Sequence, residues 1–120
     1  MNEQFILKVL DYILNNIDKV SNSGSWTVSA ELDDKERVEI NAFNLVKNNS
    51  IDNDSYVCNV TVGGATRHVG LTQKAYNLIM YKLGEIEEKY INYKMNIISN
   101  IIDYKKPEPL TSMDSLFDEN

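Results

Sequence analysis

The chain is poor in the residues from which most disulfide, metal and redox sites are built. Its 120 residues include one cysteine, Cys58, and one histidine, His68. A lone cysteine excludes a disulfide framework within the chain and suits a reducing compartment. One cysteine and one histidine also cannot supply the ligands of a structural zinc site. We therefore expect a cytoplasmic protein with no cofactor and no metal site.

Long hydrophobic runs and a basic surplus are also absent. The apolar residues near the N-terminus are interleaved with polar ones, so neither a signal peptide nor a membrane span is predicted. The net charge is −6. Residues 1–71 carry ten acids and six bases, residues 72–106 carry six bases and four acids, and residues 107–120 carry four acids and no base. This distribution lacks the basic face of a duplex-DNA-binding protein.

The spacing of apolar residues predicts two helices around a set of strands. Apolar residues recur at helical spacing over residues 2–20, and the polar stretch 21–25 follows. Residues 26–32 and 38–42 then alternate apolar with polar side chains, which predicts a hairpin with Ala30 opposite Ile40 and Val28 opposite Ala42. A second hairpin is expected over residues 56–71, turning at Gly63-Gly64. The predicted fold is α+β, ordered α-β-β-β-β-α, with a four-stranded antiparallel sheet packed on helices.

The predicted core lies on one face of this sheet. Alternation along the strands places a set of large apolar side chains against the helices: Trp26, Val28, Ile40, Val60 and Val62. In the second hairpin the same alternation pairs Cys58 with Val69 on the apolar face and Asn59 with His68 on the opposite face. In this register Cys58 and His68 cannot form a catalytic dyad, whereas a loop of odd length would place both on one face at the expense of the apolar pairing. A buried Cys58 and a solvent-side His68 are expected, with no catalytic residue.

One long helix, residues 72–106, dominates the C-terminal part of the chain. It contains no proline, and its apolar residues follow a heptad pattern that is broken at Asn100. Such a helix is about 50 Å long and exceeds the diameter of a globule of this size, about 35 Å. We therefore expect self-association, with a homodimer as the first expectation, through Tyr90, Tyr93, Ile97, Asn100, Ile101 and Tyr104. Its tyrosines could also be interpreted as a stacking platform for bases, but heptad spacing favours core or interface positions.

Residues 107–120 have two prolines, four acids and no periodicity, so this segment is expected to be a disordered acidic tail. Residues 1–106 are expected to form a single domain. Within it, Met113, Leu116 and Phe117 are set among acids. The segment 113–117 resembles the short peptides that dock on the bacterial replication sliding clamp. That resemblance implies that Leu116 and Phe117 would enter a hydrophobic pocket. The clamp peptides usually begin with glutamine, where this chain has Met113.

These observations predict a non-enzymatic protein that works by binding another protein. The heavy use of Asn, Ile, Lys and Tyr is typical of an AT-rich coding sequence, as in low-GC bacteria and their phages. The leading hypothesis is a phage or mobile-element inhibitor that occupies the surface of a host or defence enzyme. The alternative is a replication or recombination accessory that contacts single-stranded nucleic acid and recruits the clamp through its tail.

Overall fold

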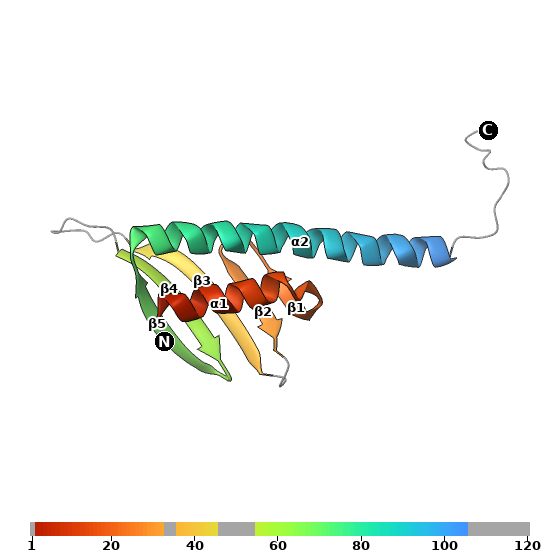
Figure 1. Cartoon of the computed structure of the whole chain (residues 1–120). Coiled ribbons are helices and arrows are strands. Elements are labelled where there is room, and N and C mark those ends of the chain that lie inside the picture. Colours follow the sequence, from red (N-terminus) through yellow and green to blue (C-terminus); the bar gives the residue numbers. More distant parts are fainter. Residues whose placement is uncertain (1, 33–35, 46–54, 106–120) are drawn as a thin grey trace.

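The computed structural model describes residues 2–32, 36–45 and 55–105. In this part of the chain an antiparallel sheet is covered on one face by two helices (Figure 1). The strands follow one another in the order β1-β2-β3-β4-β5. The elements are α1 (Glu3–Leu14), the short 3-10 helix η1 (Ile17–Lys19), β1 (Val20–Ser23), β2 (Thr27–Glu31), β3 (Arg37–Leu45), β4 (Ser55–Val62), β5 (Ala65–Leu71) and α2 (Gln73–Lys105). The α+β class expected from the sequence is confirmed, but the sheet has five strands and not four.

The additional strand, β1, is formed by residues that the sequence placed in a helix end and a break. Helix α1 ends at Leu14 because the side-chain amides of Asn15 and Asn16 donate to the carbonyl oxygens of Asp11 and Tyr12, at 2.9 and 2.8 Å. These local bonds compete with continuation of the helix. The chain then passes through η1, and Val20 enters the core from β1, where it pairs with Ala30.

The two predicted hairpins are present, and one has a different register. In β2 and β3, Val28 pairs with Ile40 and Ala30 pairs with Val38, two residues from the expected pairing. Because side chains alternate with a period of two, this shift keeps the same residues on the buried face. In β4 and β5 the observed pairs are those predicted. The turn between them has Gly63 and Gly64 at φ 58° and 90°, a left-handed conformation that favours glycine.

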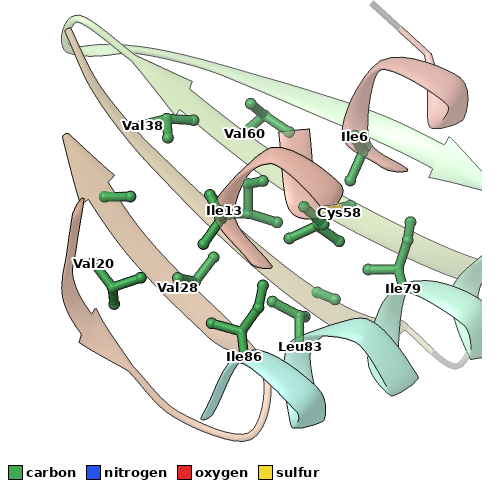
Figure 2. Packing of buried hydrophobic residues seen from close by; sticks show 14 of the residues in the cluster. Ile6, Ile13, Val20, Val28, Val38, Cys58, Val60, Ile79, Leu83 and Ile86 are labelled. Atoms are coloured by element: carbon green, nitrogen blue, oxygen red, sulfur yellow. The ribbon is translucent and has the colours of Figure 1, made fainter. Parts of the chain in front are cut away.

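The core lies between the helices and the inner face of the sheet. Figure 2 shows buried side chains from α1, α2 and the sheet pointing toward one another. Val28, Ile40 and Val60 are fully buried as predicted, while Val62 is only half-buried. The prediction for Trp26 is wrong, because this side chain is 61% exposed. Trp26 lies in the connection between β1 and β2, just before β2 begins at Thr27, so the alternation of that strand does not fix the direction of its side chain.

Helix α2 is continuous from Gln73 to Lys105 and begins as predicted. The Thr72 hydroxyl accepts from the Ala75 amide at 3.1 Å, which caps the first turn. Its first half packs on α1, η1 and the strands. Lys82 Nζ lies 2.6 Å from Asp11 Oδ1 of α1. Its second half, drawn in blue in Figure 1, extends past β1 and away from the sheet.

Candidate functional site

Cys58 and His68 lie on opposite faces of the sheet, as the alternation predicted. Cys58 is fully buried, and burial raises the pKa of its thiol from 9.0 to about 11, partly offset by a hydrogen bond with the backbone of Asn41. A buried thiol with a raised pKa is a poor nucleophile. His68 is exposed, and its Nδ1 is hydrogen-bonded to Oδ1 of Asn59 on the neighbouring strand. The two side chains do not meet, so they form no catalytic dyad.

The described residues offer little else from which to build a chemical site. No group of three or more His, Cys, Asp or Glu side chains in residues 2–32, 36–45 and 55–105 is arranged to hold a metal ion. An open hollow of about 490 Å³ lies between the start of α1 and β5. It is lined by Asn2, Glu3, Gln4, His68, Val69 and Gly70. The hollow is wide open to solvent, and its one imidazole is already bonded to Asn59.

The C-terminal peptide singled out by the sequence lies outside the described residues. This applies to all three of its expected contact residues, Met113, Leu116 and Phe117. Docking through this peptide therefore stays a prediction. The other expected site is on α2, and the structure describes most of it.

Residues 91–105, here called the projecting half of α2, extend beyond the body of the protein. The last anchor of α2 to the body is Tyr90, which is half-buried and whose hydroxyl donates to the carbonyl oxygen of Ser21 at 3.1 Å. Every residue from Ile91 to Asp103 is exposed. Fifteen residues correspond to a rod of about 22 Å. The sheet and α1 therefore give this length of helix no surface to pack on.

The self-association residues expected from the sequence are divided by this boundary. Tyr90 belongs to the body, and Lys94 Nζ lies 5.6 Å from the centre of its ring. Tyr93, Ile97, Asn100 and Ile101 are exposed on the projecting half. Tyr104 also lies in α2, at a position whose side chain is not described. The predicted heptad is thus continuous as a helix, but its earlier members, such as Leu83, are buried in the core of the same chain.

Two lines of apolar residues run along the projecting half. The inner line is Tyr93, Ile97 and Ile101, with exposed fractions from 36 to 49%. Ile97 and Ile101 follow Ile79 and Leu83 by eighteen residues, or five helical turns, so this line continues the face that packs on the body. The outer line lies about a third of a turn away. It consists of Ile91, Met95, Ile98 and Ile102, with exposed fractions from 50 to 61%.

The sequence showed that apolar residues cover more than one stripe here, but it could not identify the outer line as a separate face. Over residues 91–103 the remaining face of the helix is uncharged except at its end. It carries Asn92, Asn96, Ser99, Asn100 and Asp103. Lys94 is the one basic side chain described in this segment. The projecting half is therefore an amphipathic helix with a wide apolar face and a weakly charged polar face.

No helix within the described ranges is long and apolar enough to span a membrane. Comparison with family models, with curated proteins and with solved structures found no match to this chain.

Proposed function

We propose that this protein acts by binding another protein, without a catalytic step, and that the projecting half of α2 is its contact surface. One observation carries the proposal. Between Ile91 and Ile102, large apolar side chains stay 36–61% exposed on a helix that the body does not cover. Contiguous apolar surface of this kind on a folded protein is typical of interaction sites.

The free energy available from this surface is enough to support association. Fully burying a side chain of this size contributes about 1.5–3 kcal/mol, so covering a half-exposed one contributes roughly 1 kcal/mol. The seven residues of the two lines together offer roughly 7 kcal/mol. A partner contributes its own apolar surface, and association costs about 4–15 kcal/mol. A surface of this size therefore supports binding when the partner is comparably apolar.

Charge favours a protein partner over nucleic acid. The basic side chains in the described ranges are distributed over α1, η1, β3, β5 and α2. Among them, Lys82 pairs with Asp11, and Arg37 pairs with Glu39 at 3.7 Å. Binding to nucleic acid depends on a cluster of bases that replaces counterions along the phosphates. The nucleic-acid accessory function expected as the alternative therefore depends on the C-terminal peptide and on stacking by the tyrosines of α2.

The test is affinity capture with the full chain as bait and bacterial lysate as the source of partners. The test variant carries Ile97→Asp and Ile98→Asp, which places one charge on each apolar line. The control carries Asn96→Asp and Asn100→Asp, which adds the same charge to the polar face of the same segment. We expect partners retained by the wild type and the control to be lost by the test variant, with unchanged circular dichroism. Equal capture by the test variant would place the contact surface elsewhere.

The finer expectation is that the partner is a host or defence enzyme inhibited by this chain. The captured enzyme would be assayed with the wild type, the control and the test variant. Inhibition by the first two and not by the third would support this role. Full activity in the presence of bound wild-type chain would contradict it.

A further inference from the structure

The apolar residues of the outer line are confined to the projecting half of α2, whereas those of the inner line continue a face that is also apolar over the body. Its spacing of four, three and four residues is that of the a and d positions of a heptad. Eighteen residues earlier on the same face stand Gln73, Asn77, Met80 and Gly84, of which only Met80 is apolar and partly buried. On this line of α2, the positions over the body are therefore mostly polar or glycine, although Leu78 and Tyr81 are 44% and 63% exposed on the adjoining outward surface. A continuous apolar line at these positions begins only beyond Tyr90, where a second helix has room to lie alongside.

We propose that a second copy of this chain covers the outer line, with the two projecting halves packed antiparallel. This inference rests on the proposed function in taking the projecting half as the binding surface. In an antiparallel pair, a positions pack against d positions. Met95 then faces Ile98 of the second copy, and Ile91 faces Ile102 of the second copy. By symmetry this makes four successive apolar layers, and every residue of the outer line has a partner.

The charges at the two ends of the outer line select this arrangement. The next heptad position before Ile91 is Glu88, which is exposed, and the next position after Ile102 on the helix is Lys105, whose side chain is not described. In the antiparallel register, Glu88 lies level with Lys105 of the second copy, at both ends of the pair. A parallel pair would instead place Glu88 level with Glu88 and Lys105 level with Lys105, and like charges at facing positions destabilise. The ends therefore favour one orientation.

The flanking positions are compatible with the same register. Lys94 falls beside Ile101 of the second copy, where the aliphatic stem of a lysine can cover an isoleucine while its charge stays in water. On the other flank, Asn92 and Ser99 are uncharged. The antiparallel pair also places the two bodies, in which residues 1–71 carry ten acids and six bases, at opposite ends of the paired helices.

Sedimentation equilibrium on the full chain at about 1–200 µM tests the inference. We expect the wild type to move with concentration from 13.7 kDa toward twice that mass. Ile98→Asp should raise the dimer dissociation constant at least about 100-fold, because it places two charges between apolar layers. Asn96→Asp, on the polar face of the same segment, should leave it within about twofold. Ile98 lies outside the core, so circular dichroism of both variants should match the wild type.

Charge reversal then tests the orientation. Glu88→Lys alone should weaken the dimer about tenfold, because lysines then face each other at both ends. Adding Lys105→Glu to the same chain should restore wild-type affinity. A parallel dimer would show no loss from the single reversal, and that result would overturn the antiparallel register.

The outcomes separate this inference from the proposed function. A wild-type chain that stays monomeric up to about 200 µM, or a dimer unaffected by Ile98→Asp, would overturn the inference. If the wild-type chain stays monomeric and Ile98→Asp still abolishes capture of another protein, the proposed function stands and the dimer inference fails. If the dimer forms as described and capture of other proteins survives its disruption, the inference stands, and the proposed contact with other partners does not use the outer line.

Discussion

Ile79 and Ile97 provide a matched test of where the body of this protein ends along α2. They are the same residue type, eighteen residues apart on one helix face, and both are in regular helix. Ile79 is fully buried in the cluster formed with α1 and the strands, whereas Ile97 is 39% exposed on the projecting half. Truncating each to alanine removes the same atoms from two different surroundings.

The structure predicts very different costs for the two truncations. Ile79→Ala removes fully buried methyl and methylene groups and leaves a cavity, which costs about 2–5 kcal/mol of unfolding free energy. Domains of this size are stable by about 5–15 kcal/mol, so the loss is a large fraction of the total. Ile97→Ala removes groups that touch no part of the body. Its effect should stay within about 0.5 kcal/mol, with a slight gain from the higher helix propensity of alanine.

Urea unfolding followed by far-UV circular dichroism measures both values. We expect a midpoint for Ile97→Ala that matches the wild type and a clearly lower midpoint for Ile79→Ala, with similar slopes in all three. Repeating the experiment at two protein concentrations separates folding from association. A loss above about 1 kcal/mol for Ile97→Ala at both concentrations would show that the projecting half packs on its own body and would refute the reasoning. A loss below about 1 kcal/mol for Ile79→Ala would refute the core assignment.

Three further predictions concern the body. Thr72→Ala removes the hydroxyl that accepts from the Ala75 amide, so it should lower the unfolding free energy by about 0.5–2 kcal/mol in the same urea assay, and an unchanged midpoint would exclude a capping role. Gly63→Ala should destabilise by more than about 1 kcal/mol, because φ is 58° there and an added Cβ would lie 2.7 Å from Glu36 Oε2. Gly70→Ala, with nothing within 4 Å of the added Cβ, is its control, and equal costs would contradict the turn assignment. Burial holds the pKa of Cys58 at about 11 in the folded state, against 9.0 when unfolded. The contribution of this thiol to the unfolding free energy is therefore fully present below pH 9 and is lost as the pH rises toward 11. The unfolding free energy of Cys58→Ala should fall less steeply than that of the wild type over this range, and parallel pH profiles would refute the assignment.

Within the sheet, the features that sequence patterns predicted correctly are those fixed by a period of two. The faces of β2, β3, β4 and β5 depend only on which residues are odd or even along each strand. That is why the pairing of Val28 with Ile40, and not with Ala42, left the predicted faces intact. The pairing around Gly63-Gly64 was predicted in full because a two-residue turn with φ above zero fixes the register.

Strand β1 was missed because its pattern is short and polar. Of its four residues only Val20 is apolar, and Val20 also fitted the helical spacing that began at Ile6. The decisive signal was the pair Asn15-Asn16, whose side chains bond to the carbonyl oxygens of the last helical turn. Two consecutive asparagines therefore indicate the end of the helix. They do not indicate the strand that follows, because β1 forms only by pairing with the edge of β2.

The candidate surface shows a different limit of sequence patterns. Periodicity predicted a heptad stripe along α2 from Tyr76 to Tyr104, with further apolar residues outside it in the C-terminal half, and nothing in the spacing distinguishes Leu83 from Ile101 as buried or exposed. Leu83 is buried and Ile101 is 49% exposed because the sheet ends between them. The point along α2 at which burial stops depends on the width of the sheet, which is set by the number of strands that lie side by side. Tyr90 is the last residue that anchors α2 to the body. Relative to it, the positions Gln73, Asn77 and Gly84 lie over the body, and the equivalent positions Ile91, Met95 and Ile102 lie beyond it. A continuous apolar line on a face turned away from the helix's own core is typical of a surface that another molecule covers, so the proposed contact surface begins where the body stops.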